Sequence, residues 1–346
     1  MAGYYDYAGA IHVHSKYSDG LSDVPAVIEA ANKAGCDYLI ITDHNTRGGS
    51  SYEGWHGRTM VLVGEEITVG NEEGHYLGLN LTDKVAPNQT PQKTIDLVKQ
   101  QGGLGFIAHP IGIIDHNVLQ ITPLPWQDWA TTGFDGIEIW NYGQDWIENF
   151  QGSRYYLPGL ANPDTSIDGP PAATLRKWDA LQKRRKVIGI GCVDAHGYYY
   201  SYRRMFKTLR THLLLKNRLS GRPDSFARDK EALYSALKRG NCYFSYDYRQ
   251  NGKGFMFSGD NGSTRVIMGE GLRLKDQVRL KASTPRPGLL RIVRDGRVAA
   301  NAEGVNTLTL EVKEPGAYRV EALFYGSRGM KKAYIPWIYS NPIYIR

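Results

Sequence analysis

The chain has 346 residues, of which 41% are hydrophobic and 22% charged, and this composition excludes the disordered, collagen and coiled-coil classes. Its length favours two domains, and no run of 18 consecutive apolar residues predicts a transmembrane helix. The 42 Lys and Arg residues outnumber the 35 Asp and Glu residues, and the formal charge of +7 favours small anionic partners.

From residue 8 to about residue 200, short apolar runs alternate with helical patterns, which is typical of repeated βα units in a parallel sheet or barrel. The first helix is expected to begin after Ser22 or Asp23, either of which can cap it, and to end at Gly35. Strands are predicted at 8–13, 38–42, 61–63, 76–81, 104–108, 136–140 and 187–190, and further helices at about 91–101 and 171–183.

Two later segments depart from this rhythm. Residues 142–170 are rich in aromatic residues, Gly and Pro and show no clean periodicity, which indicates a functional loop. After a helix at about 226–239, the chain reads as short alternating strands with a two-residue hairpin at Asp295-Gly296. We therefore expect an α/β domain at 1–250, with an aromatic insertion at about 142–170, and a small antiparallel β-rich, sandwich-like domain at 251–346.

Histidines and carboxylates lie at, or just after, the ends of the predicted strands. His12 and His14 are two residues apart, so on an extended strand both side chains point to the same face. The carboxyl ends of strands in a parallel α/β sheet converge on one face, where active sites form. Imidazole and carboxylate ligands suit zinc, manganese and iron. The candidate metal ligands are His12, His14, Asp19, His44, Glu66, His75, His109, Asp194 and His196.

These nine side chains exceed the three or four protein ligands that one ion uses, so the count predicts two or three divalent metal ions. Glu66 could bridge two ions, and a hydroxide trapped between them would be an effective nucleophile at neutral pH. The adjacent Glu65 competes for this role, but neighbouring side chains on a strand point to opposite faces, so one glutamate at most faces the ions. The remaining histidines, His56, His116 and His212, fall outside the pattern.

Other features of the sequence bear on the role of the cysteines, the cellular location and the partners. Cys36, Cys192 and Cys242 are an odd number without close spacing, which excludes a disulfide framework and a thiolate metal site and leaves them to fill the core. The N-terminus has neither the basic region nor the apolar stretch of a secretory signal, so a cytoplasmic location is the default. No dedicated nucleic-acid-binding motif is found, and the oligomeric state is left open.

Seven short motifs, in this order along the chain, resemble those of the PHP (polymerase and histidinol phosphatase) superfamily. They are His12-Val13-His14-Ser15, Ser18-Asp19-Gly20, Thr42-Asp43-His44-Asn45, Gly64-Glu65-Glu66, Gly74-His75, Ala108-His109-Pro110 and Asp194-Ala195-His196. The resemblance implies a distorted (β/α)7 barrel with up to three metal ions at its carboxyl-end face. It further implies that His12, His14, Glu66 and Asp194 hold one ion, that Glu66, His75 and His109 hold a second, and that Asp19, His44 and His196 hold a third.

Three further segments, 136–141, 191–197 and 337–343, are similar to a branch of this superfamily named after carbamate-insecticide (carbaryl) hydrolases. A small β-rich C-terminal part is typical of that branch, which agrees with the change of pattern after residue 250. Similarity of this kind guides the choice of substrate less than the motifs guide the choice of metal ligands.

The leading hypothesis is a metal-dependent phosphoesterase acting on a phosphoric mono- or diester, in which a metal-bridging hydroxide attacks phosphorus and the ions stabilise the developing charge. The expected catalytic residues are His109, Asp194 and His196, and either histidine, or a metal-bound water, could protonate the leaving group. Arg203 and Arg204 are placed to bind a phosphate bidentately, although surface salt bridges would also account for them.

Two other functions stay open. The same site could hydrolyse a carbamate, ester or amide, and an apolar pocket without a guanidinium near the ions would favour this alternative. A non-catalytic, metal-stabilised module, whose β domain binds a carbohydrate or protein partner, would be expected to lack some of the ligands. The aromatic residues of 142–170 and 198–200 could wall the pocket against an aryl or nucleoside group, or could pack the barrel against the C-terminal sheet.

Overall fold

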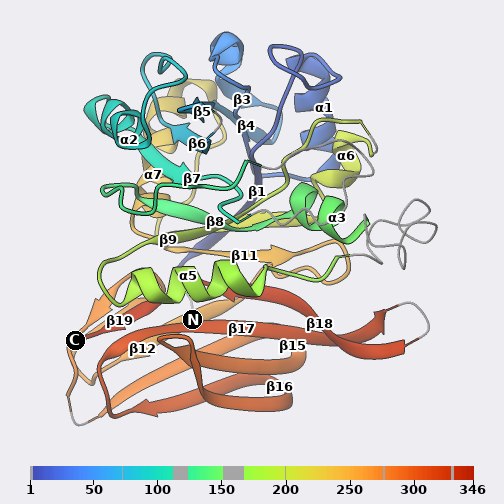
Figure 1. Ribbon diagram of the computed structural model, residues 1–346. Helices are drawn as coiled ribbons and strands as arrows, with labels where there is room; N and C mark the ends of the chain where they lie inside the picture. Colours follow the sequence, from blue (N-terminus) through green and yellow to red (C-terminus); the bar gives the residue numbers. More distant parts are fainter. Residues whose placement is uncertain are drawn as a thin grey trace.

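Two β-sheets carry the helices and loops of the molecule (Figure 1). The structure is a computed structural model that describes residues 3–71, 73–111, 124–150, 167–198, 200–275, 277–328 and 331–346. Most of the aromatic segment, together with His116 and Tyr199, lies outside the described residues.

The larger sheet begins with the first strands of the chain. Strands β1 (Tyr5–Ile11), β2 (Tyr38–Ile41) and β4 (Thr59–Val63) run parallel, and β3 (Gly54–His56) is added at the edge. On the other side of β1 the sheet continues antiparallel. It passes through β10 (Leu209–Leu215) to β11 (Cys242–Tyr246).

The smaller sheet has five strands. Strand β6 (Gly74–Leu79) pairs antiparallel with both β5 (Glu65–Val69) and β7 (Leu104–Ile107), whereas β7, β8 (Gly136–Asn141) and β9 (Ile188–Cys192) are parallel. The sequence predicted most of these strands. It missed β5, because Glu65 and Glu66 were expected to follow a strand rather than to begin another.

The sheets meet without closing a barrel in the described part of the chain. The chain turns at Gly64 from β4 into β5, and two isolated bridges, Val13 with Ala195 and His44 with Glu66, join the ends of strands from both sheets. Between β9 and β10 no backbone ladder forms, and the Thr211 hydroxyl instead donates to the carbonyl of Gly191 at 2.8 Å. The fold is therefore mixed α/β, and the expected (β/α)7 barrel is not confirmed.

Helices cover the outer faces of these sheets. Asp23, not Ser22, caps α1 (Val24–Ala34) by accepting from the Ala26 amide at 3.0 Å, and Gly35 ends the helix with a φ of 76°. Residues 142–150, expected to be aperiodic, form α3, because Tyr142 and Trp146 fall four residues apart on one buried face. The other helices are α2 (Pro91–Gln100), α5 (Ala172–Gln182), α6 (Tyr202–Met205) and α7 (Phe226–Lys238), with short 3₁₀ turns η1 (Gly48–Tyr52) and η3 (Pro223–Ser225).

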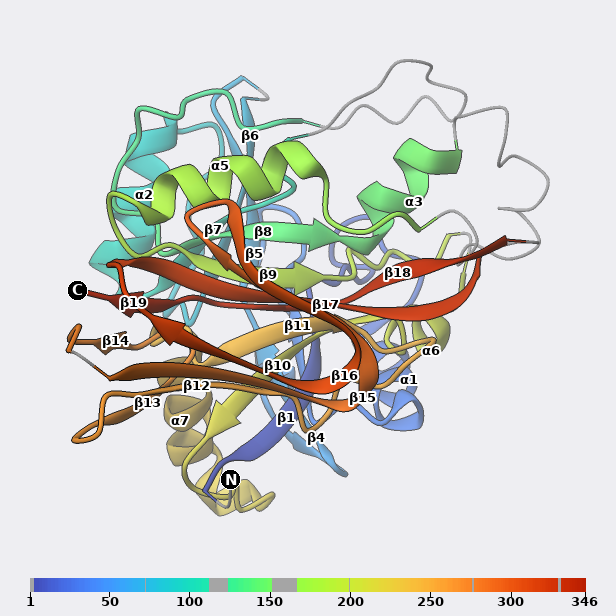
Figure 2. The same cartoon turned by 90° about the horizontal axis from the view of Figure 1, so that it is seen from below.

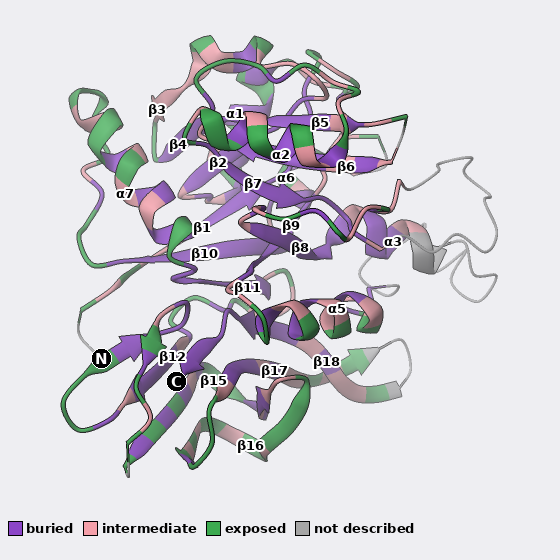
Figure 3. Cartoon of the chain, turned by 60° about the vertical axis from the view of Figure 1, so that its left-hand side comes forward, coloured by how far each residue is buried: buried purple, intermediate pink, exposed green. Residues whose placement is uncertain are grey.

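The C-terminal part is β-rich, as expected, and its strands pair antiparallel except at 271–272 and 343–345, which pair parallel with each other. Its longest strands, β15 (Val278–Arg294) and β16 (Arg297–Val312), are joined at Asp295 and Gly296, whose φ angles of 50° and 87° both suit the predicted two-residue turn. Figure 3 shows β16 largely exposed, whereas β1, β7 and β8 are buried. The remaining strands are β12 (Met256–Asp260), β13 (Arg265–Ile267), β14 (Gly271–Leu272), β17 (Gly316–Arg328), β18 (Lys331–Ser340) and β19 (Ile343–Ile345).

The C-terminal strands continue the larger sheet. Strand β18 pairs antiparallel with β11, with Phe244 opposite Tyr339, so one ladder crosses the expected boundary at residue 250. Figure 2 shows β15 to β18 laid across this side of the molecule. Helix α5 is tied to β17 because Arg319 makes a buried bidentate ion pair with Asp179, at 2.7 and 2.8 Å. The division into two domains at residue 250 stays a prediction.

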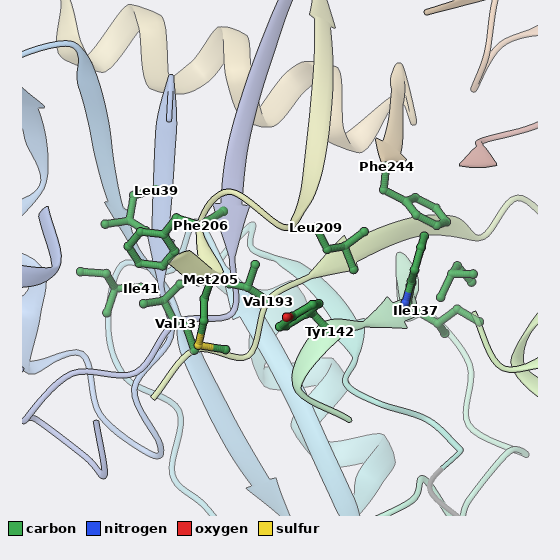
Figure 4. Close-up of a cluster of buried hydrophobic side chains, with 14 of the residues drawn as sticks. Val13, Leu39, Ile41, Ile137, Tyr142, Val193, Met205, Phe206, Leu209 and Phe244 are labelled. Carbon is green, nitrogen blue, oxygen red and sulfur yellow. The ribbon is translucent and has the colours of Figure 1, made fainter. Parts of the chain in front are cut away.

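Burial agrees with the expected core. The three cysteines are buried and unpaired. Figure 4 shows one cluster of buried side chains, in which Val13 and Val193 pack beside Leu209 and Phe206. Among the described residues, no helix combines the length and apolarity needed to cross a lipid bilayer.

Candidate metal centre

All nine side chains proposed as ligands lie together at the strand ends where the two sheets meet. Glu66, on β5, is at the centre, and only 1% of its side chain is exposed. One carboxylate oxygen, Oε2, lies 3.0 Å from Nε2 of His12, 3.2 Å from Nε2 of His14 and 3.2 Å from Nδ1 of His44. The other, Oε1, lies 2.8 Å from Nδ1 of His75 and 3.1 Å from Nε2 of His109.

Two further carboxylates complete the cluster. Asp194 Oδ1 lies 3.4 Å from Nε2 of His12 and 3.5 Å from Nε2 of His14. Asp19 Oδ2 lies 3.3 Å from Nε2 of His196 and 3.7 Å from Nε2 of His44. Ligand atoms fall within 4.8 Å of one another in four groups: His12, His14 and Glu66; His12, His109 and Asp194; His44, Glu66 and His75; and His14, Asp19, His44 and His196.

The backbone that presents three of these residues is strained. His12, His109 and Asp194, which form one of the four groups, have φ angles of 67°, 24° and 50°. Non-glycine residues rarely adopt such angles, and the strain costs about 1–3 kcal/mol at each position. The prediction that His12 and His14 lie on an extended strand is wrong, because β1 ends at Ile11. Both rings nevertheless enter the cluster, with centroids 5.2 Å apart.

Glu138 contacts the cluster, and the sequence analysis did not predict it. It is buried on β8, its Oε1 lies 2.6 Å from Nδ1 of His12, and its Oε2 accepts from the His109 amide at 2.7 Å. The side-chain amide nitrogen of Asn141, Nδ2, donates to carboxylate oxygens of both Glu138, at 3.0 Å, and Asp194, at 3.1 Å. A charged residue inside the apolar run at 136–140 was the available signal.

The carboxylates of the cluster are held ionised. Burial raises the pKa of Glu66, but the neighbouring His12, His75 and His44 outweigh this effect and hold the pKa well below its usual value. For Asp194, burial is likewise outweighed, chiefly by His12, and its pKa also lies well below the ordinary value. Ionised carboxylates are the form that binds a metal ion.

The histidines differ in how their surroundings act on them. Burial lowers the pKa of His14, but the carboxylates of Asp194 and Glu66 reverse the direction and raise the pKa to about 9. For His44, burial prevails and lowers the pKa to about 4. Negative charge is therefore concentrated around His14, where a cation would be stabilised.

The buried donor atoms fit divalent metal ions. The Nε2 atoms of His12 and His14 are buried and face carboxylate oxygens. Neither atom forms a hydrogen bond of acceptable geometry with any residue that the structure describes. Buried imidazole nitrogen without a hydrogen bond is costly unless it binds a ligand. Glu65, the competing glutamate, lies outside the cluster, accepts from the Val85 amide at 2.8 Å, and has its pKa raised to about 7 by burial.

A cavity of about 370 Å³ opens over the cluster. Asp194, His109 and His196, the expected catalytic residues, all line it. Arg203 and Arg204 do not, and no Lys or Arg is among the described residues that do. The wall facing the cluster is apolar and aromatic, and consists of Leu124, Tyr142, Trp146, Ile147, Tyr198, Tyr200 and Met205.

Of the two arginines, Arg204 lies beside this wall. Arg203 is exposed, and the guanidinium of Arg204 lies 5.0 Å from the ring centre of Tyr200 and 5.5 Å from that of Tyr248. Arg204 therefore supports an aromatic residue of the cavity. Of the remaining histidines, His56 and His212 lie apart from the cluster, as expected.

Comparisons with known proteins give a family model and a relative. A model of the PHP domain matches residues 10–117, which include seven of the nine candidate ligands. An uncharacterized protein of Methanocaldococcus jannaschii is 31% identical over 157 residues, which are 40% of this chain and 85% of that protein.

Two solved structures also match. One, from Bacteroides vulgatus, is a two-domain protein containing a predicted PHP-like metal-dependent phosphoesterase; it is 15% identical, with a TM-score of 0.44, and the match covers 97% of this chain and 96% of that one. The other is a candidate metal-dependent phosphoesterase from Bifidobacterium adolescentis, 16% identical with a TM-score of 0.33, matched over 54% of this chain and 87% of that one.

Proposed function

The chain belongs to the PHP domain family, and from this premise we propose that it is a metal-dependent phosphoesterase that hydrolyses small phosphoric mono- or diesters. The observation that carries the proposal is the position of Glu66, whose two carboxylate oxygens face different histidines, three on one side and two on the other. A carboxylate in this position could be shared between two metal ions.

The proposed ligand sets are those that the motifs imply, and they agree only in part with the four groups in the cluster, because His109 falls with His12 and Asp194 there. His12, His14, Glu66 and Asp194 would hold one ion, Glu66, His75 and His109 a second, and Asp19, His44 and His196 a third, with zinc, manganese or iron as the metal. His14 also lies within 4.8 Å of the third set, and His44 within 4.8 Å of Glu66 and His75, so these two histidines stand between neighbouring sets.

When bound, the ions would supply Lewis-acid activation of water and would neutralise negative charge on the phosphoryl oxygens. The chain itself fixes the donor atoms. Glu138 would accept a hydrogen bond from Nδ1 of His12 when an ion is bound, which would leave Nε2 to bind that ion. Asn141 holds Asp194 in the same way, through its amide.

Proton transfer to the leaving group is assigned to a histidine of the cavity. Hydrolysis breaks the bond between phosphorus and the leaving oxygen, which must gain a proton as water adds to phosphorus. Where it is not bound to the third ion, His196 is the more accessible candidate, with 22% of its side chain exposed against 8% for His109. A role for Arg203 and Arg204 in binding phosphate directly stays a prediction.

One observation favours a second candidate, hydrolysis of a carbamate, ester or amide. The described lining of the cavity is largely apolar and contains no guanidinium or ammonium group. A neutral substrate would enter such a cavity without an added cation. The similarity of 136–141, 191–197 and 337–343 to the carbaryl-hydrolase branch supports the same candidate.

A substrate panel separates these functions. Metal-reconstituted protein would be given p-nitrophenyl phosphate, bis(p-nitrophenyl) phosphate and an aryl carbamate, with Asp194→Asn as the inactive variant and Asp224→Asn, an exposed site on η3, as the matched control. We expect turnover of a phosphoester that the Asp194 variant loses and the control keeps. Carbamate turnover alone would replace the proposal by the second candidate, and a folded, metal-loaded protein without any turnover would support a binding module.

A further inference from the structure

The aromatic wall of the cavity is built into the core of the molecule. Tyr142 and Trp146 come from α3, directly after β8, and Met205 comes from α6. Tyr142 and Met205 also belong to the buried cluster drawn in Figure 4, where they lie beside Val13 and Val193, which are next to candidate ligands in sequence. The wall is therefore held at a fixed position relative to the metal centre.

The aromatic rings of this wall support one another. The rings of Trp146 and Tyr200 pack edge to face, with centroids 5.7 Å apart, and the guanidinium of Arg204 covers Tyr200 from behind. Such contacts restrict the side-chain rotamers and fix the orientation of the rings.

Tyr198 stands at the junction of the wall and the metal centre. Its ring stacks on the candidate ligand His196, with centroids 5.8 Å apart and planes inclined by 16°, and its hydroxyl donates to the backbone carbonyl of Asp19. Even so, 53% of Tyr198 is exposed. An aromatic ring that is held in place and still exposed, beside a catalytic centre, offers a stacking surface to a ligand.

From these contacts, and resting on the proposed function, we propose that the substrate is a small ester whose reacting phosphoryl group carries an aromatic ring, and that Tyr198 and Trp146 bind this ring. The cavity volume of about 370 Å³ suits a small molecule rather than a polymer. Aromatic stacking discriminates a planar ring from a saturated ring of similar size, because only the planar ring has a π face.

Binding of three phosphonates to metal-reconstituted protein, measured by calorimetry, tests this inference. Methylphosphonate, cyclohexylphosphonate and phenylphosphonate share the charged group and differ in the substituent. We expect phenylphosphonate to bind about tenfold more tightly than methylphosphonate, with cyclohexylphosphonate in between. Equal affinities for the phenyl and cyclohexyl compounds would overturn the inference.

Variants at Tyr198 test whether the preference for phenylphosphonate over methylphosphonate comes from the aromatic wall. Because Tyr198 is more than half exposed, Tyr198→Leu is expected to fold, and it should reduce the phenyl-to-methyl ratio about threefold. Tyr198→Phe keeps the ring and should keep the ratio, as should Tyr325→Leu, a matched change at an exposed tyrosine of β17. An unchanged ratio in Tyr198→Leu would contradict the role of this residue.

Failure of the inference and failure of the proposed function give different results. A protein that hydrolyses phosphoesters but binds the three phosphonates equally would refute the aromatic inference alone. If none of the phosphonates binds and no phosphoester is hydrolysed, both proposals fall.

Discussion

At the scale of single residues, Glu138 decides how the candidate ligands are presented. Its carboxylate contacts the ring of His12 and the backbone of His109, and through Asn141 it is linked to Asp194. Carboxylates that hold a ligating histidine in this way typically alter metal affinity by about 10–100-fold when they are replaced.

We therefore predict that Glu138→Gln weakens binding of the most tightly held metal ion by about 10–100-fold while the chain stays folded. The glutamine keeps the size of the side chain but loses the charge that fixes the His12 tautomer. Competition with a chromogenic chelator measures the affinity, and circular dichroism checks the fold. Glu231→Gln, an exposed change on α7, serves as the control, and equal affinities in the two variants would show that Glu138 has no such role.

The sequence was sufficient to predict which side chains form the centre, but not how they are held. His44 and His109 could be placed because parallel strands bring their carboxyl ends to one face. Glu138 could not, because its partner His12 is 126 residues away and nothing in either segment records the contact. The left-handed backbone of His12 and Asp194 likewise depends on tertiary contacts that local propensity does not describe.

At the scale of elements, a buried charged network joins β1, β10 and β11 at a distance from the metal centre. Nδ1 of His212 lies 2.8 Å from Asp6, and its Nε2 lies 3.1 Å from Asp247. Tyr243 stacks on the imidazole and donates to Asp6, while Arg210 lies 3.8 Å from Asp247. Burial lowers the pKa of His212, but the two aspartates outweigh it and raise the pKa to about 9.

This network predicts a loss of stability at alkaline pH. A histidine whose pKa is raised on folding contributes its full stability below the ordinary value of 6.5 and loses it as the pH rises through about 9. The difference between the pKa of His212 in the unfolded chain, 6.5, and in the folded chain, about 9, corresponds to about 3 kcal/mol in the free energy of unfolding. Folding lowers the pKa values of Asp6 and Asp247. These two groups therefore stabilise the fold at pH values above their ordinary pKa of 3.8, and their contribution to stability is lost only in acid.

Urea unfolding at pH 6 and pH 9.5 checks this prediction. Between pH 6 and pH 9.5, the free energy of unfolding should fall by about 3 kcal/mol more in the wild-type chain than in His212→Gln. Only the wild type carries the His212 imidazole that loses its proton in this range. All other titrating groups are common to both proteins. Parallel pH profiles for the two proteins would contradict the prediction.

Asn341 replaces the missing backbone ladder between β9 and β11. Its side chain, 1% exposed, accepts from the Gly189 amide at 2.8 Å and donates to the carbonyls of Gly189 and Cys242 at 2.8 and 3.0 Å. Asn341→Ala would leave these buried backbone groups unsatisfied, so we expect a loss of about 3 kcal/mol in the free energy of unfolding. Asn301→Ala, on the exposed strand β16, should change it by less than about 0.5 kcal/mol.

Equilibrium unfolding in denaturant compares the two asparagine variants. A loss in Asn341→Ala no larger than that in Asn301→Ala would show that Asn341 does not connect the sheets. The prediction concerns stability alone, so metal content is held constant in both measurements.

Strand β10 could not be predicted from the sequence, for a physical reason. Strand β10 contains Arg210, Thr211 and His212, which break an apolar strand pattern, yet all three are buried in the structure. Their partners, such as Asp6 and Gly191, come from distant parts of the chain. A local pattern cannot show that a polar residue will be buried with its charge or hydrogen bonds satisfied.

At the scale of the whole molecule, the C-terminal strands complete a sheet that the first 250 residues begin. Strand β11 pairs with β18, and Arg319 on β17 is buried with Asp179 on α5. A chain ending at residue 250 would expose the edge of β11 and leave Asp179 without its ion pair.

We therefore predict that residues 1–250 expressed alone do not form a stable, cooperatively unfolding protein. Differential scanning calorimetry should show a single transition for the full chain and none for the fragment. A fragment that unfolds cooperatively and binds metal like the full chain would establish residue 250 as a domain boundary and remove the structural role assigned to β18.

The barrel expected from the family resemblance is the largest difference between expectation and structure. Seven motifs placed the ligands at one face, and the structure brings them to one face. They did not determine which strand edges pair, and the edges of β9 and β10 are joined by side chains such as Thr211 rather than by a ladder. Pairing between edges is a property of the whole sheet and has no local sequence pattern.

The central claim is that Glu66 and the histidines around it hold divalent metal ions. Elemental analysis of the protein after dialysis against excess zinc, manganese or iron and removal of free metal tests it most directly. We predict two or three ions per chain in the wild type and fewer in Glu66→Gln. Less than one ion per chain in the wild type, or the same content in both proteins, would contradict the claim.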